Sequence, residues 1–351
     1  MATYRFDEIA INSTKKKKPT EEDKAHYIGL EHIDPGCFNI VRWGSDVVPT
    51  GDKLLMQKGD VLFGKRRAYQ RKVGIAPFDG IFSAHGMVLR PNTKIIDTNY
   101  FPFFISSDRF METAVRISVG GLSPTINWKD LAKQEFDLPS LEEQKVLAEK
   151  LWVAYRLKEG YKKLLCVTDE MVKSQFIEMF GTSCDSVKTI LSDFVSLKAG
   201  KNKKSELIKD VFTDGLYPCY GGNGIRGYVE DYTHSGIYCI IGRQGAQCGN
   251  VQIAEGEFYA TEHAVVVTPL TDVNSIWLFH ALTQMNLNQY ARGAAQPGLA
   301  VNQLEKLPFS LPGIVSQTQF ALIADQADKS KFELKQCIEN IDKVIKSLIN
   351  G

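Results

Sequence analysis

The sequence Leu138-Pro139-Ser140-Leu141-Glu142-Glu143-Gln144 recurs 173 residues later as Leu311-Pro312-Gly313-Ile314-Val315-Ser316-Gln317. An upstream block recurs at the slightly larger offset of 178, so that Gly64 corresponds to Gly242 and His85 to His263. A match over such a distance is the signature of an internal repeat. The two halves of the chain therefore share one plan, and the loops between the matching blocks differ in length.

After each of these entries the spacing of the apolar residues changes to alternating steps of four and three. This heptad pattern covers Leu147 to Met179 in the first half and Phe320 to Leu348 in the second, and Lys158 and Lys331 interrupt both at the same place. The pattern predicts two long helices of equal phase. Equal phase favours an intramolecular antiparallel coiled coil, although two helices that each dock on their own domain remain an alternative.

The residues expected in the seam between the helices are the apolar members of the heptads. They are Leu147, Leu151, Tyr161, Leu165, Val172, Phe320, Leu334, Ile338, Ile341 and Ile345. Ser140 and Glu143 predict a capping box for the first helix and Gly181 its end, while Ser316 with Gln319 predicts a cap for the second.

The segments before the helices contain short apolar runs bounded by Gly, Pro and Asp, which is typical of strands. Examples are 60–63, 86–89, 237–241 and 264–267, and short helices are expected at 100–110 and 275–287. The predicted fold is α+β with a pseudo-two-fold internal repeat. Two mostly-β globular domains, residues 1–140 and 182–312, alternate with two long helical spacers, residues 141–181 and 313–351.

The composition agrees with a globular chain of about two domains. The 351 residues are 44% hydrophobic and 24% charged, and the formal net charge is +1, which excludes a binder that is basic all over but not a local basic surface. No apolar run has the length of a bilayer span and the start of the chain is polar, so we expect a cytoplasmic protein with no membrane partner. The seven cysteines form no Cys-x-x-Cys pair, which indicates reduced thiols and no metal site.

No catalytic constellation is visible, and neither a Walker A sequence nor a His-Glu-x-x-His motif occurs. Residues 222–227 satisfy Gly-x-Gly-x-x-Gly, but the segment that follows, 228–232, has the pattern of a strand rather than a helix. The sequence therefore predicts a glycine-rich β-turn there, no cofactor and no enzymatic activity of the chain itself.

The strongest local signal is Gly64-Lys65-Arg66-Arg67-Ala68-Tyr69-Gln70-Arg71-Lys72, which joins two predicted strands and carries five cations without an acid. Guanidinium groups bind guanine edges or phosphates, and glutamine can bind adenine. The equivalent place in the second half is Gly242-Arg243-Gln244-Gly245-Ala246-Gln247. The residues predicted to contact DNA are Lys65, Arg66, Arg67, Tyr69, Gln70, Arg71, Lys72, Asn223, Arg226, Arg243, Gln244 and Gln247. The alternative is a solvated cationic hairpin, and the separate run 15–18 is either a surface loop or a phosphate contact.

Several long strings in the first half, 27–36, 59–73 and 82–85, resemble those of the specificity (S) subunits of type I restriction-modification systems. The Leu-Pro-x-x-x-x-x-Gln entry to each helix is also typical of that family. The resemblance implies two target recognition domains that bind a bipartite, asymmetric site in double-stranded DNA. It further implies a non-catalytic chain that recruits two methyltransferase (M) subunits and, through them, restriction (R) subunits in phage defence. The second half lacks the dense basic string, so its base-reading residues stay open.

Three alternatives remain. The partner could be a fused methyltransferase-nuclease of a related system. A glycine-loop enzyme would use residues 222–227, but the required strand-turn-helix context is missing. A scaffold that does not bind DNA would use only the twin helices, and the basic string 65–72 argues against it.

Overall fold

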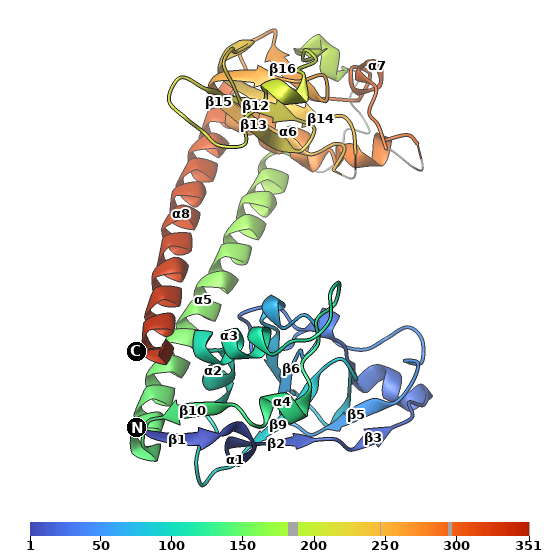
Figure 1. The fold of residues 1–351 in the computed structure, drawn as a ribbon. Helices are drawn as coiled ribbons and strands as arrows, with labels where there is room; N and C mark the ends of the chain where they lie inside the picture. The colour runs from blue at the N-terminus through green and yellow to red at the C-terminus, as the bar shows by residue number, and fades with distance from the viewer. Residues whose placement is uncertain (182–188, 246, 294–296, 351) are drawn as a thin grey trace. The chain divides into compact units, whose positions relative to one another are not determined.

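The computed structural model describes residues 1–181, 189–245, 247–293 and 297–350 (Figure 1). The chain divides into two compact units, one formed by Met1–Lys162 with Lys335–Gly351 and the other by Lys163–Leu334. Two long helices, α5 (Leu141–Phe180) and α8 (Ile314–Asn350), each contribute one part to unit 1 and one part to unit 2.

Unit 1 contains three small sheets. One pairs β1 (Ala2–Arg5) with β10 (Glu135–Leu138), the second has the order β2 (Ala10–Ser13), β9 (Met87–Pro91), β6 (Val61–Phe63), β7 (Val73–Ile75), and the third the order β3 (Lys16–Lys17), β5 (Lys53–Met56), β8 (Gly80–Phe82), β4 (Tyr27–Ile28). All neighbours are antiparallel except β4 and β8, which are parallel. The short helices are α1 (Phe6–Ile9), α2 (Phe101–Ser106), α3 (Asp108–Arg116), α4 (Trp128–Leu131), η1 (Glu21–His26), η2 (Leu30–His32) and η3 (Ala68–Gln70).

Aromatic side chains fill the core of unit 1. Seven phenylalanines are fully buried there: Phe6, Phe63, Phe82, Phe101, Phe103, Phe110 and Phe136. The single helix predicted over 100–110 is wrong, because Ser107 has extended backbone geometry and separates α2 from α3. The Ser107 hydroxyl accepts from the backbone N–H of Phe110 and so starts a new helix.

Unit 2 contains one six-stranded sheet. Its order is β11 (Val195–Ala199), β16 (Ala264–Pro269), β14 (His234–Gly242), β15 (Val251–Ala260), β12 (Tyr217–Gly221), β13 (Gly224–Val229), and only β12 and β15 pair in parallel. Its short helices are α6 (Ser275–Gln284), α7 (Val301–Leu304), η4 (Leu191–Asp193), η5 (Ser205–Leu207) and η6 (Leu287–Tyr290). Side chains alternate between two cores, as a strand requires: Ile241 faces the core that contains α6, and Ile240 the opposite one.

The start and end of α5 follow the predicted signals. The Ser140 hydroxyl accepts from the Glu143 N–H at 3.3 Å, and the Glu143 carboxylate accepts from the Ser140 N–H at 2.8 Å. Gly181, at φ 79°, ends the helix with a hydrogen bond to the carbonyl of Ile177. The predicted cap at Ser316 is wrong, because α8 begins at Ile314, so that Gly313 takes the place of Ser140 in the repeat.

A buried glutamine near the start of each long helix explains why the entry sequence ends in Gln. Gln144 and Gln317 are both fully buried. The Gln144 side chain accepts from the backbone N–H of Asp97 just before α2 and donates to the carbonyl of Pro139. The Gln317 side chain accepts from the N–H of Asn274, the residue that caps α6, and donates to the carbonyl of Pro312. Each glutamine therefore joins the start of a long helix to the start of a domain helix.

The long helices pair antiparallel within each unit. In unit 1, where the end of α8 lies beside α5 (Figure 1), Lys158 on α5 forms an ion pair of 2.5 Å with Asp342 on α8. In unit 2, Lys331 on α8 forms one of 2.8 Å with Asp169 on α5. Lys331 and Asp342 are the repeat equivalents of Lys158 and Asp169. Each unit thus holds the same ion pair with the two helices exchanged, as in an isologous contact.

The predicted seam residues are all buried or half-buried. Leu151, Val172 and Phe320 lie in the domain cores, and Leu147 and Ile345 pack against the core of unit 1. The other five predicted seam residues are half-buried: Tyr161, Leu165, Leu334, Ile338 and Ile341. Within the described ranges, no helix is long and apolar enough to cross a membrane. The cysteines in those ranges are free thiols, and Cys184 lies outside them.

Candidate nucleic-acid interface

The basic string of unit 1 forms a compact loop between β6 and β7, here called tip 1 (residues 64–72). The Gly64 N–H donates to the carbonyl of Lys72 at 2.9 Å and closes the loop. The Arg67 N–H donates to the carbonyl of Pro124, and the carbonyl of Lys65 accepts from the N–H of Ile126. Tip 1 is therefore held by its own ends and by the glycine-containing loop 119–126.

Two arginines in tip 1 adopt a backbone conformation that usually favours glycine. Arg67 (φ 55°) and Arg71 (φ 51°) are left-handed and flank η3. This geometry costs a residue with a side chain about 1–2 kcal/mol. Strain of this kind persists where surrounding structure imposes it, and it concentrates at functional sites. It points to a role for these arginine side chains.

The predicted residues of tip 1 fall into two groups. Arg67 and Tyr69 are exposed, Tyr69 by 54%, and Lys65, Arg66 and Gln70 are half-buried. The Arg67 guanidinium donates to the Ser123 hydroxyl at 3.1 Å. None of these five side chains pairs with an acidic residue within the described ranges.

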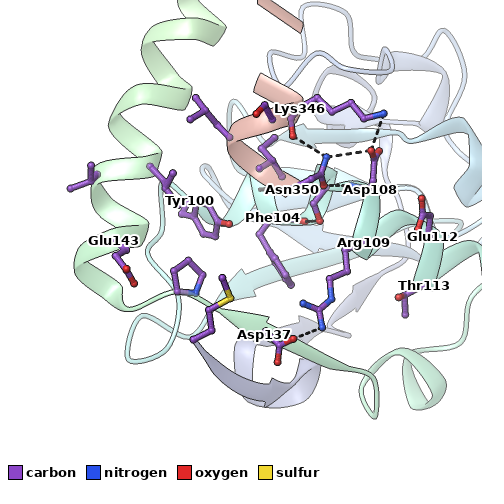
Figure 2. Close-up of a pocket in the computed structure, with 18 of the residues that line it drawn as sticks. Tyr100, Phe104, Asp108, Arg109, Glu112, Thr113, Asp137, Glu143, Lys346 and Asn350 are labelled. Atoms are coloured by element: carbon purple, nitrogen blue, oxygen red, sulfur yellow. Dashed lines mark hydrogen bonds and ion pairs between the residues drawn. The ribbon is translucent and has the colours of Figure 1, made fainter. Parts of the chain in front are cut away.

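The other two predicted residues of tip 1, Arg71 and Lys72, bind within unit 1. Arg71 pairs with Asp108 at 2.8 Å, and Lys72 donates to the carbonyl of Leu30 at 2.6 Å. Asp108 also binds Lys346 and Asn350 at the end of α8 (Figure 2). Burial acts to raise the pKa of Asp108, but Lys346 and Arg71 outweigh it, so the pKa lies below its ordinary value. Arg71 and Lys72 therefore anchor the tip.

Further cations surround tip 1. Burial and the charge of Lys16 in β3 lower the pKa of Lys65. Burial lowers the pKa of His85, with smaller contributions from Arg66, Lys65 and Lys53. The sequence indicated the run 15–18 but not its approach to tip 1, since that depends on the pairing of β3 with β5. Lys16 and Lys53 thus add to a local positive field, which favours an anionic ligand.

Unit 2 builds the same frame at the predicted place, here called tip 2 (residues 242–250, of which 246 is not described). The Gly242 N–H donates to the carbonyl of Asn250, and the Gly245 N–H to that of Pro297. Both bonds are the repeat equivalents of those in tip 1. Gly245 (φ 87°) and Gly249 (φ 90°) occupy the two left-handed positions that arginines hold in tip 1. The same loop is therefore presented twice, with different side chains.

The predicted residues of unit 2 lie on tip 2 and on an adjacent hairpin. Gln244 and Gln247 are exposed on tip 2, and Arg243 is half-buried. Residues 222–227 form the predicted β-turn and the start of β13, which places Asn223 at an exposed turn. The carbonyl of Gly222 lies so close to Gly242 that a side chain on Gly242 would collide with it. Arg226 donates to Ser205 at 2.8 Å. Asn223 thus lies near tip 2.

Comparison with known proteins agrees with this architecture. A family model described as the type I restriction modification DNA specificity domain matches residues 2–164 and 185–343. The EcoprrI specificity subunit of Escherichia coli is 45% identical over 157 residues, which are 44% of this chain and 39% of that protein. A putative type I restriction enzyme specificity subunit of Haemophilus influenzae is 32% identical over 127 residues, 35% of this chain and 33% of that protein.

A solved structure shows the same fold. The S subunit of a type I restriction-modification system from M. genitalium aligns with 99% of this chain and 95% of its own, at a TM-score of 0.60 and 17% identity. The fold is thus that of a protein with two β-rich domains and two paired long helices. The chain belongs to the family of type I restriction-modification specificity (S) subunits. The alignments to the two curated relatives span less than half of their lengths.

Proposed function

We propose that this chain is the non-catalytic subunit that gives a type I restriction-modification complex its DNA sequence specificity. Residues 1–140 and 182–312 act as target recognition domains, and residues 141–181 and 313–351 as helical spacers. Each domain binds one half of a bipartite, asymmetric site in double-stranded DNA. Two M subunits bind the chain, and R subunits join through them.

One observation carries this proposal. Each unit builds the same frame, in which a tip joins two strands and is hydrogen-bonded to a second loop, and the two tips present different polar side chains. Lys65, Arg66, Arg67, Tyr69 and Gln70 project from tip 1, and Arg243, Gln244 and Gln247 belong to tip 2. Arginine and lysine suit guanine edges and phosphates, and amide side chains suit adenine. Two similar frames with different side chains are suited to two different half-sites.

The proposal is tested by co-expressing the full chain with the methyltransferase subunit of its system in a host without DNA methylation. We expect methylation at a motif of two specified parts separated by unspecified bases. Purified complex should bind duplexes that carry this motif more tightly than random duplexes at the same salt concentration. The proposed function would be contradicted if the complex produced no methylation above an empty-vector control and bound no duplex preferentially.

A further inference from the structure

A carboxylate lies beside tip 2 where tip 1 has none. Glu262 occupies the turn between β15 and β16, and the next residue, His263, accepts at its carbonyl from the Arg243 N–H of tip 2 at 3.0 Å. The repeat places Ala84 of unit 1 at the position of Glu262, directly before His85. The surroundings of the two tips therefore differ in charge, and the tips themselves differ in the hydrogen-bond donors that they carry.

The Glu262 carboxylate has unused hydrogen-bonding capacity. Its Oε1 lies 3.4 Å from His263 Nε2, and within the described ranges no lysine or arginine pairs with it. Its Oε2 is enclosed and has no hydrogen-bond partner among the described residues. An enclosed carboxylate oxygen without a donor is costly. The side chain is 36% exposed, so the carboxylate can turn outward to a donor from a ligand.

Three polar atoms near Glu262 are also enclosed without a hydrogen-bond partner in the described part of the chain. They are Arg243 Nε, the Oγ1 of the fully buried Thr261 and His263 Nδ1. Buried polar groups are paired in the great majority of cases, so such a concentration is unusual. It lies directly against tip 2, at the place where the proposed function requires contact with a base.

We propose that Glu262 determines the specificity of tip 2 by accepting a hydrogen bond from the N4 amino group of a cytosine. This inference rests on the proposed function. In the major groove the cytosine edge carries an amino group, which donates a hydrogen bond to a carboxylate. The guanine edge carries acceptors, which suit the guanidinium groups of tip 1. Phosphates repel a carboxylate, so Glu262 contributes discrimination between bases rather than overall affinity.

The test uses the full chain assembled with its methyltransferase subunit. Binding is measured to a set of duplexes in which each base pair of the motif is replaced in turn. Three variants are compared with the wild type: Glu262→Ala, Glu262→Gln, which keeps the size of the side chain, and the control Glu255→Gln, an exposed carboxylate on β15. Melting temperatures check that all variants are folded.

We expect both Glu262 variants to lose about 10- to 100-fold of discrimination at a single C·G pair of one half-site. Their affinity for duplexes altered at that pair should be unchanged or higher, and the control should behave as the wild type. Unchanged discrimination, an equal loss of affinity for every duplex, or relaxation at an A·T pair would overturn the assignment of Glu262. Failure of the wild type to prefer any motif would instead contradict the proposed function.

Discussion

Arg66 and Arg67 are two of the tip 1 cations that have no acidic partner in the part of the chain that the structure describes. We expect Arg66→Ala with Arg67→Ala to weaken binding to the cognate duplex. A lost base contact costs about 1–3 kcal/mol, and each lost phosphate contact lowers the salt dependence by about one unit. Binding measured at several salt concentrations separates these contributions.

The control for this double variant is Arg109→Ala, which removes an exposed arginine that pairs with Asp137 in the same unit. It should bind DNA as the wild type does. If the double variant bound DNA as tightly as the control, tip 1 would not be part of the DNA interface.

Gln144 and Gln317 support a second prediction at the residue scale. Replacing Gln144 with Ala leaves the Asp97 N–H and the Pro139 carbonyl without their partner and should lower the free energy of unfolding by about 2–3 kcal/mol. Gln317→Ala should have a similar effect, while the exposed Gln319→Ala should have little. Urea denaturation measures all three, and a change below about 0.5 kcal/mol in both buried variants would contradict the role given to these residues.

The roles of residues were only partly predictable. Tip 1 was visible because its cations are adjacent in sequence and its glycine recurs in the repeat. The division of those cations into unpaired and anchoring ones could not be predicted, because Arg71 and Lys72 bind partners some 37 and 42 residues away. Glu262 carried no signal, since its contrast with Ala84 matters only once the two tips are seen to share a frame.

At the scale of elements, the long helices were the most predictable part of the fold. The heptads placed the end of α5 within one residue, because periodicity over many turns and a terminal glycine act together. The break at Ser107 was hidden by a continuous apolar pattern. The division of unit 1 into three sheets was hidden as well, because strand pairing depends on contacts between distant segments.

The seam predicts the effect of charges on the helix pair. Leu165→Asp and Ile338→Asp each place a charge at a half-buried seam position and should destabilise the chain by about 1–3 kcal/mol. The matched control is Val167→Asp, on α5 but 47% exposed. Thermal melting compares the three variants, and equal melting of all of them with the wild type would contradict the seam.

At the scale of the whole molecule, the two units share two continuous helices, and we predict that the helices set the number of unread base pairs in the DNA site. Removing Glu159–Leu165 from α5 and Phe332–Ile338 from α8 deletes one heptad from each. It keeps the lysines and aspartates of both ion pairs. Each helix becomes about 10 Å shorter, which corresponds to about three base pairs. Methylome sequencing of the deletion variant should show a motif with about three fewer unread base pairs. An active variant whose motif kept the original spacing would exclude this role.

The central claim is that two equivalent tips read two different halves of one DNA site. The most direct measurement compares the methylated motifs produced by three forms of the complex: the wild type, Arg66→Ala with Arg67→Ala in tip 1, and Gln244→Ala with Gln247→Ala in tip 2. We predict that each variant relaxes base preference in one half of the motif only, and that the two variants affect opposite halves. Relaxation of the same half by both variants, or an undivided motif in the wild type, would contradict the account.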